Sequence, residues 1–319
     1  MPTGGQAVLR PASWRPVAVG RVQLRGIAQV ALSASPWTGL LFVAALFADS
    51  WWIGVFGLLG TAASTGTAAV LGADRDSRLR PGLEGYCGCL TGIALLLRFG
   101  ASWRTALLTV LAAAVCSVLG AASVRLLGRV GLPMLTAPYC LVTGVLVTAL
   151  PTASAAAASP APVAGITGLS AADIGNAFCD NIGQVFFLDK WYAGLILLAG
   201  LLVTSWRAAL AAACGSAVAI LTAYVMGLPA DHIGAGLYGY NAVLVAIALG
   251  TTFLTLTPWS AGYAVLAAVA SVPFTTAWTA FVQPSGGSPF TWPFVVTTWL
   301  FLAAVPVLDR PGISLEKAK

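Results

Sequence analysis

The stretch GLEGYCGCLTGIAL at residues 82–95 occurs a second time, in altered form, as GLYGYNAVLVAIAL at residues 236–249. Both copies place two glycines and a tyrosine at matching positions, and both continue as a run of mainly apolar residues. The copies begin 154 residues apart, at Gly82 and Gly236, in a chain of 319 residues. Self-similarity at a fixed spacing is the signature of an internally repeated fold. The stretch therefore predicts a chain built from two related halves.

Two further matches have almost the same spacing. IAQVALSASPWTGLL, from residue 27, matches IGQVFFLDKWYAGLI, from residue 182, and aligns Gln29 with Gln184. APYCLVTG at 137–144 matches WPFVVTTW at 292–299 and aligns Thr143 with Thr298. Composition alone explains three such matches poorly, because they occur in the same order in each half. We predict a tandem duplication.

The composition indicates a membrane protein. Lys plus Arg number 16 and Asp plus Glu number 10, so that 8% of the chain is charged, while 59% is hydrophobic and the mean hydropathy is +0.90. A soluble domain is usually about 25% charged, so a water-soluble enzyme is excluded. Lipid-facing β-strands alternate apolar and polar residues, whereas the apolar runs here are continuous. The fold class we predict is an all-α polytopic membrane protein.

Apolar runs bounded by charges, prolines and glycines give five candidate spans in each half. They lie at about 26–48, 51–72, 82–98, 103–127 and 132–150, and at about 181–203, 206–227, 233–254, 260–281 and 290–308. The corresponding domains are a basic cytoplasmic tail (1–25), a first repeat (26–150), an extracellular Ala/Pro/Ser-rich linker (151–180), a second repeat (181–308) and a second cytoplasmic tail (309–319).

The basic residues predict the orientation of these spans. With the N-terminal tail in the cytoplasm, all but three of the 16 basic residues fall on the cytoplasmic side; the exceptions are Arg98, Arg104 and Lys190. This agrees with the positive-inside rule, and both termini are then cytoplasmic. Since five spans per repeat is an odd number, the second repeat is inverted. Inverted repeats place a transport site near the bilayer midplane.

Four uncharged polar side chains are related by the duplication: Gln29, Gln184, Thr143 and Thr298. Polar groups at membrane depth are costly unless they have protein partners or line a wet cavity. As a symmetric set they indicate a pathway for a neutral polar solute that both donates and accepts hydrogen bonds. The alternative is that they only join helices by hydrogen bonds.

Apolar residues accompany these polar groups in both halves. Tyr86 and Tyr240 are each followed four residues later by a leucine, Leu90 or Leu244, which places both side chains on one helical face. Leu32 and Phe187 each follow a glutamine by three residues, so the set could form a flat slot that excludes hydrated ions. Ordinary core packing is the alternative interpretation.

Other functional classes have little support. The chain has no GxxxxGK[ST] motif for a nucleotide, and its carboxylates lie mainly at the ends of the apolar runs, which does not favour proton- or cation-coupled transport. The Asp74–Arg75–Asp76 stretch has no second acidic cluster with which to complete a Mg²⁺ site. The six cysteines form no metal-ligand pattern, and the scattered basic residues do not indicate nucleic-acid binding. No cofactor or metal is expected, and we interpret His232 as a surface histidine.

The duplicated motifs resemble those of the urea transporter family. The resemblance rests on QV followed by an aromatic-rich turn and GL, on the GLYGYN element, and on PY or PF followed by threonine, and it covers about residues 25–308. It implies a central pore in each protomer of a homotrimer, ten spanning helices, two tilted half-membrane (re-entrant) helices, and passive, channel-like movement of urea across a cell membrane. It also implies that the chain is not an enzyme.

The resemblance assigns roles to the repeated residues. Gln29 and Gln184 would offer oxygens to urea near the two ends of a narrow filter, and Thr143 and Thr298 would mark its middle. The walls would be formed in the first half by Leu32, Tyr86 and Leu90, and in the second by Phe187, Tyr240 and Leu244. Three residues depart from the family pattern: Cys87 replaces asparagine, Glu84 replaces an aromatic residue, and Leu32 replaces an aromatic residue. The sequence leaves open a pore for another small neutral or weakly basic solute, such as ammonia or a short amide.

Overall fold

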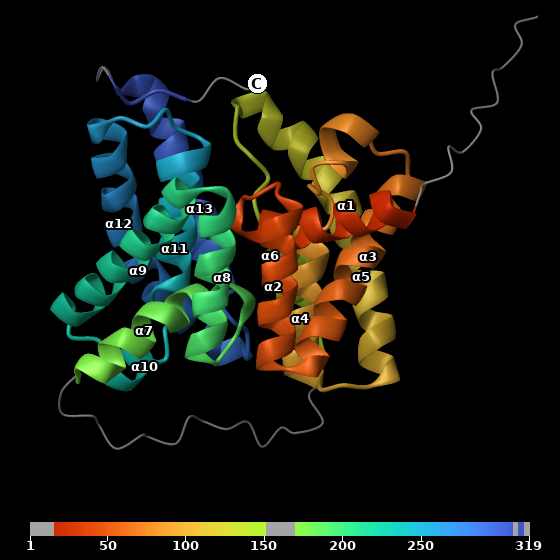
Figure 1. Ribbon diagram of the computed structural model, residues 1–319, viewed down its shortest axis with the longest axis horizontal. Coiled ribbons are helices and arrows are strands. Elements are labelled where there is room, and N and C mark those ends of the chain that lie inside the picture. Colours follow the sequence, from red (N-terminus) through yellow and green to blue (C-terminus); the bar gives the residue numbers. More distant parts are fainter. Residues whose placement is uncertain (1–15, 151–169, 309–311, 316–319) are drawn as a thin grey trace, which may run out of the picture.

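The computed structural model describes residues 16–150, 170–308 and 312–315. Within these ranges the protein is helical, apart from an isolated antiparallel bridge between Leu254 and Leu315. The first half of the chain and the second half form two adjacent groups of helices, coloured red to yellow and green to blue in Figure 1. The protein is therefore an all-helical molecule, as the composition predicts.

Four described helices are long and apolar enough to cross a membrane, and two bent helix pairs bring the number to six if each pair is one span. The four are α3 (Trp51–Val70), α5 (Trp103–Leu127), α9 (Trp206–Val225) and α12 (Pro258–Val282). Trp51, Trp103 and Trp206 begin three of them and are more than half exposed. Tryptophan is enriched at membrane–water interfaces, so these exposed rings fit the ends of membrane-spanning helices.

The first expected span of each half is broken. α1 (Pro16–Ala28) and α2 (Pro36–Asp49) meet at 78°, and α7 (Ala171–Gly183) and α8 (Trp191–Thr204) meet at 74°. The spans expected at 26–48 and 181–203 are therefore not single continuous helices. A proline at the first position of α2, capped by the Ser35 side chain, starts a new helix there, because proline cannot continue the previous one.

The same two pairs place helix where the sequence predicted tail and linker. α1 begins at Pro16, within the predicted tail 1–25, and α7 begins at Ala171, within the predicted linker 151–180. The start of α7 is a capping box in which Ser170 and Asp173 satisfy each other's backbone N–H groups. The rest of both predicted segments, residues 1–15 and 151–169, lies outside the described residues.

Four further apolar helices are shorter than a membrane span: α4 (Tyr86–Phe99), α6 (Ala137–Ala149), α11 (Tyr240–Ile247) and α13 (Trp292–Ala304). At 1.5 Å per residue, the 14 residues of α4 reach about 21 Å. Each short helix is preceded by a turn or loop, so the apolar helices within the spans expected around 82–98 and 233–254 begin at Tyr86 and at Tyr240. A short helix α10 (Ala230–Gly234) precedes the second of these.

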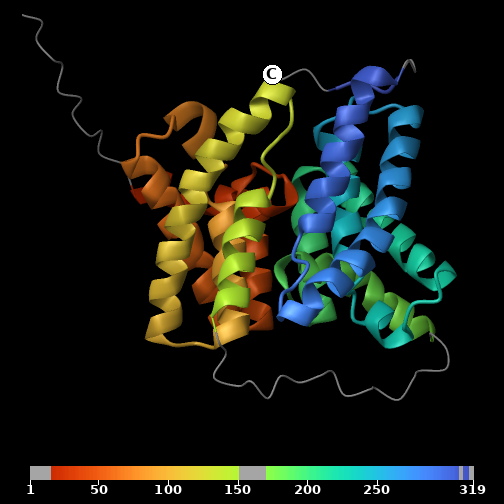
Figure 2. The ribbon, with the colours of Figure 1, turned by 180° about the vertical axis from the view of Figure 1, so that it is seen from behind.

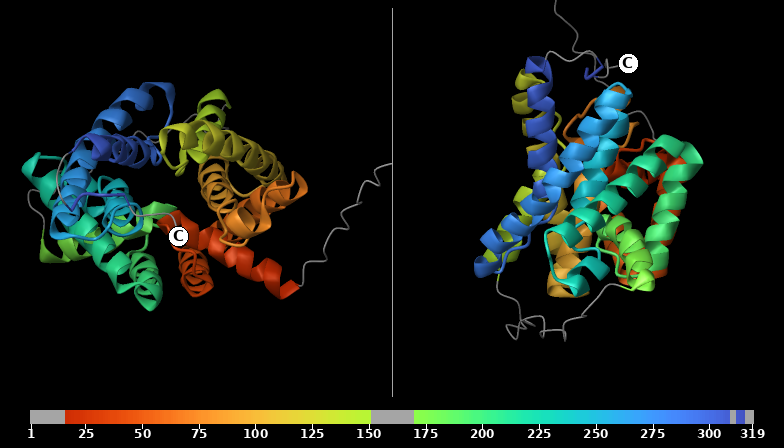
Figure 3. Two further views of the ribbon diagram at one scale, coloured as in Figure 1. Left: turned by 90° about the horizontal axis from the view of Figure 1, so that it is seen from above. Right: turned by 90° about the vertical axis from the view of Figure 1, so that its left-hand side faces the viewer.

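Helices pack in corresponding ways within each half and meet in two places between the halves. α3, α4 and α5 contact one another, as do α9, α11 and α12. Between the halves α2 packs against α8, and α6 approaches α13 from the other side (Figures 1 and 2). The Thr38 hydroxyl of α2 donates to the Gly200 carbonyl of α8 at 2.9 Å. Viewed from above, the two halves lie side by side with α1 extending along one edge (Figure 3).

Candidate functional site

Two short 3-10 turns carry the predicted glutamines. η1 (Gln29–Ala31) ends at Leu32 and η4 (Gln184–Phe186) ends at Phe187, with both terminal residues in the left-handed region at φ 59° and 61°. Non-glycine residues seldom adopt this conformation. It turns the chain between the two helices of each bent pair, so that Leu32 and Phe187 lie at the bend. Such backbone strain is typical of functional sites.

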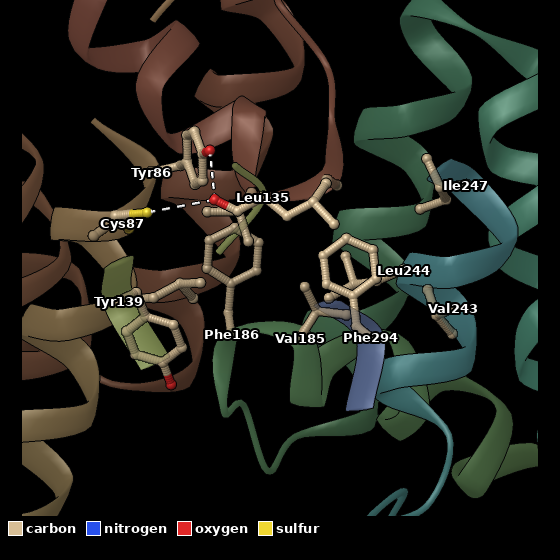
Figure 4. Packing of buried hydrophobic residues seen from close by; sticks show 14 of the residues in the cluster. Tyr86, Cys87, Leu135, Tyr139, Val185, Phe186, Val243, Leu244, Ile247 and Phe294 are labelled. Atoms are coloured by element: carbon tan, nitrogen blue, oxygen red, sulfur yellow. Dashed lines mark hydrogen bonds between the residues drawn. The ribbon is translucent and has the colours of Figure 1, made fainter. Parts of the chain in front are cut away.

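The predicted tyrosines bind a second pair of strained residues. Tyr86 Oη donates to the Leu135 carbonyl oxygen at 2.7 Å, and Tyr240 Oη donates to the Phe290 carbonyl oxygen at 2.7 Å. Leu135 and Phe290 have φ values of 46° and 45°. In Figure 4 the side chains of Tyr86 and Cys87 converge on the Leu135 carbonyl. The tyrosines therefore fix the loops that enter α6 and α13, a role that neither sequence motif revealed.

A cavity of about 370 Å³ brings part of the predicted set together, and we name it the Gln29 cavity. From the predicted set its wall includes Gln29, Leu32 and Tyr86. Phe253 and Phe294 from the second half also line it, beside further apolar residues of the first half. The cavity therefore lies where the two halves meet, which no single sequence motif could indicate.

The two glutamines are held differently. Gln29 is buried, and its Nε2 donates to the Pro81 carbonyl oxygen at 3.0 Å, which leaves Oε1 outside this bond. Gln184 is half-buried, and its Nε2 donates to Asp189 Oδ1 at 2.9 Å. In both cases the amide nitrogen is engaged by the protein. The amide oxygen is then the atom that can accept a hydrogen bond from a solute.

The two predicted threonines are fully buried but differ in their bonding. Thr143 Oγ1 donates to Thr91 Oγ1 at 3.4 Å. Thr298 Oγ1 has no hydrogen-bond partner within the described residues. The position that corresponds to Thr91 in the second half is occupied by Val245, which has no hydroxyl. The sequence alignment made these threonines equivalent, and the structure gives them different environments.

A second hydroxyl pair was not predicted from the sequence. Thr136 Oγ1 and Thr291 Oγ1 lie 2.6 Å apart and are buried, and the Cys140 Sγ lies 3.1 Å from Thr291 Oγ1. Thr136 and Thr291 have the same spacing of 155 residues as Thr143 and Thr298. That spacing is the signal that could have identified them. Thr136 also lines the Gln29 cavity.

The remaining wall residues divide into two groups. Leu90 and Leu244 are fully buried in the hydrophobic core, and in Figure 4 Leu244 extends from α11 into the labelled packing cluster. Phe187 and Tyr240 meet at Phe290: the Phe187 ring lies 6.5 Å from the Phe290 ring, and Tyr240 binds its carbonyl. The structure thus brings together one set around Gln29 and another around Phe290.

Comparison with known proteins identifies the family of this chain. A family model described as "Urea transporter" matches residues 21–306. The chain is 30% identical over 290 residues to Urea transporter 1 of Ovis aries, 30% over 289 residues to that of Rattus norvegicus, and 31% over 290 residues to that of Mus musculus. Each alignment covers 88% of this chain and 75% of the relative.

The matched residues include the bends of both helix pairs, the Gln29 cavity and the four described non-glycine residues with positive φ. The duplicated motifs, the helical membrane architecture and the family match therefore lead to one conclusion: this chain is a multi-pass membrane protein that belongs to the urea transporter family, a family of transporters rather than enzymes.

Proposed function

We propose that this protein conducts urea passively, as a channel, through a path between its two halves. The observation that carries the proposal is the Gln29 cavity, in which an amide, a hydroxyl and flat apolar rings from both halves share one wall. Urea is planar and neutral, with four N–H donors and one carbonyl acceptor. Apolar walls can cover its faces while oxygens accept from its edge.

The path we propose runs from the Gln29 cavity past the buried hydroxyls towards the group around Phe290. Its polar residues would be Gln29, Thr143, Thr298 and Gln184, and its walls would be formed by Leu32, Tyr86, Leu90, Phe187, Tyr240 and Leu244. The close pair Thr136 and Thr291 supports a polar point along this path, because its hydroxyls come from both halves. Thr298 supports it further, because its buried hydroxyl has no partner in the described part of the chain. A solute or water can supply that partner.

We propose that the halves are inverted repeats, at 26–150 and 181–308, each with five spanning elements and a re-entrant half-helix. Support comes from corresponding contacts 155 residues apart: Thr136 meets Thr291, and α2 packs against α8, its counterpart. A contact between equivalent positions is expected where a two-fold axis passes. The orientation, with both termini cytoplasmic and the linker outside, is proposed from the basic residues, and the homotrimer and the plasma membrane from the family.

Proteoliposomes that contain the purified protein test this function. In a urea gradient they should shrink and reswell faster than empty liposomes, and Thr143→Val or Gln184→Leu should slow the change severalfold. One hydrogen bond of about 1 kcal/mol corresponds to about a fivefold change. Urea flux equal to that of empty liposomes would remove the proposal.

The same preparation distinguishes the alternative solutes. Acetamide, ammonia and methylammonium are offered in separate gradients and in competition with urea. The proposal requires urea to move faster than acetamide and methylammonium through the same protein. Faster ammonia or amide flux, with urea acting only as a weak competitor, would assign the path to another solute.

A further inference from the structure

The residue Glu84, which departs from the family pattern, forms an ion pair beside the proposed path. Its carboxylate accepts from the Nε of Arg78, and its side chain is 4% exposed. The Arg78 side chain is 21% exposed and lines the Gln29 cavity together with Gln29 and Tyr86. Arg78 therefore lies in the wall of this cavity, and the buried Glu84 holds it from behind.

The turn that carries Arg78 is firmly built. The π-helical turn η2 (Arg75–Leu79) is capped by Asp74, whose Oδ1 accepts from the backbone N–H groups of Asp76 at 3.1 Å and Ser77 at 2.7 Å. Hydrogen bonds from the side chain and backbone of Ser77 lower the pKa of Asp74, so it remains a charged cap at neutral pH. The Ser64 hydroxyl donates to the Glu84 carbonyl oxygen and ties the other partner to α3. The position of the ion pair is therefore fixed from both sides.

The guanidinium of Arg78 has unused donors. A guanidinium carries five N–H groups, and Glu84 engages the one on Nε. Nη2 is buried and has no hydrogen-bond partner within the described residues. A buried donor on a charged group is costly to leave unpaired. Within the described residues nothing accepts from Nη2, and a shift of the Arg78 side chain, which lines the cavity, would present this donor to a solute.

The second half shows that the fold does not require this ion pair. The positions 154 residues further on are His232 and Tyr238, and there Nδ1 of the histidine lies 3.0 Å from the tyrosine hydroxyl. The contact is retained, but the always-charged guanidinium is replaced by an imidazole. A guanidinium with several N–H donors beside the proposed path is therefore specific to the half that contains Gln29.

We infer that Arg78 donates a hydrogen bond to the carbonyl oxygen of urea in the Gln29 cavity, and so determines specificity there. This inference rests on the proposed function. Gln29 Oε1 would accept from a urea N–H group, so that both kinds of polar group on the solute are satisfied. Glu84 orients the guanidinium and neutralises its charge, which means that the effect is a directed bond rather than a general attraction. Thiourea is the matched probe, because its sulfur is a weaker acceptor than oxygen.

The test is the double substitution Arg78→Gln/Glu84→Gln in proteoliposomes, which removes the pair without leaving a buried unpaired charge. The matched control is Arg80→Gln/Asp76→Asn, an ion pair in the same turn at 2.7 Å whose side chains are at least 70% exposed. Urea permeability should fall about tenfold in the first variant, as for a hydrogen bond to a charged group. Thiourea permeability should change by less than about threefold, and the control should keep the wild-type ratio of urea to thiourea.

Three outcomes would overturn the inference: an unchanged urea permeability, an equal loss for both solutes, or the same change in ratio in the control. The wild type is measured first, since absent urea flux there would defeat the proposed function rather than this inference. If the double variant does not fold, Arg78→Lys replaces it. The lysine ammonium can pair with Glu84 but lacks the planar set of guanidinium N–H donors. The ratio of urea to thiourea permeability should therefore still fall, and an unchanged ratio would contradict the role of Arg78.

Discussion

At the scale of single residues, the two halves place equivalent threonines in different surroundings. Thr143 is bonded to Thr91, whereas the position equivalent to Thr91 in the second half is the apolar Val245, and Thr298 keeps a hydroxyl with no partner among the described residues. An unpaired buried hydroxyl lowers stability. If the Thr298 hydroxyl is retained because it binds the solute, its removal should lower urea permeability without lowering the stability of the protein.

Thr298→Val should therefore leave the melting temperature unchanged or raise it, while urea permeability falls about fivefold, the effect of one hydrogen bond of about 1 kcal/mol. Thermal unfolding of the detergent-solubilised protein and proteoliposome swelling measure the two effects. The neighbouring Thr297 is also buried without a hydroxyl partner in the described structure, so Thr297→Val is the matched control and should leave permeability unchanged. A parallel loss in both variants would place Thr298 outside the path.

Individual site residues were predictable where the duplication marked a side chain. The repeat identified Gln29 and Tyr86, which the structure places on one cavity. It missed the Leu135 and Phe290 carbonyls, because a backbone acceptor leaves no trace in residue type. It also could not reveal that Leu32 and Phe187 adopt left-handed conformations, since glycine is the usual residue there.

At the scale of elements, the bent helix pairs depend on close approach at glycine. A Cβ atom at Gly39 would overlap the Leu24 carbonyl of α1, and one at Gly194 would overlap the Cys179 carbonyl of α7. Because these glycines have no side chain, the backbone of the second helix of each pair can lie directly against the backbone of the first. The sequence alignment had matched the two glycines without indicating what they do.

Gly194→Ala should destabilise the protein. The added methyl group would overlap backbone atoms of Cys179, which cannot move aside as a flexible side chain can. Overpacking of this kind costs about 1–3 kcal/mol, and thermal unfolding in detergent should show a lower melting temperature. Gly66→Ala is the control: Gly66 lies in α3 with no atom within 4 Å of an added Cβ. The control should keep or slightly raise the melting temperature through better helix propensity. Equal melting temperatures for the two variants would argue against the close approach.

Long helices were more predictable than broken ones. The runs expected at 51–72, 103–127, 206–227 and 260–281 correspond to α3, α5, α9 and α12, because hydropathy and length together define a spanning helix. Hydropathy did not place the bends at Leu32 and Phe187, although Pro36 follows the first bend and the charged residues Asp189 and Lys190 follow the second. Hydropathy measures partition into lipid and carries no information about direction within it.

At the scale of the whole molecule, the halves meet through α2 with α8 and through α6 with α13, while residues 151–169 join them in sequence. Packing between the halves should hold them together without the covalent link. The orientation we propose places this linker outside the cell, opposite both termini.

A protease site inserted after Ser159 tests both statements in membrane vesicles. Protease added to right-side-out vesicles should cleave the chain, whereas protease added to inside-out vesicles should not. The fragments should then co-purify in detergent and retain urea flux after reconstitution. The uncut wild type with the same protease is the control. Cleavage from the cytoplasmic side alone would reverse the proposed topology.

The hydroxyl contact between Thr136 and Thr291 has a consequence for ancestry. If one gene once encoded a single half, the same threonine in two separate subunits would have faced itself across their boundary, with the subunits inserted in opposite directions. Every substitution would then have altered both ends of the passage together. If the repeats are inverted as we propose, fusion into one polypeptide would release the two ends from that constraint, so that an arginine–glutamate pair could arise at one end and histidine and tyrosine at the other.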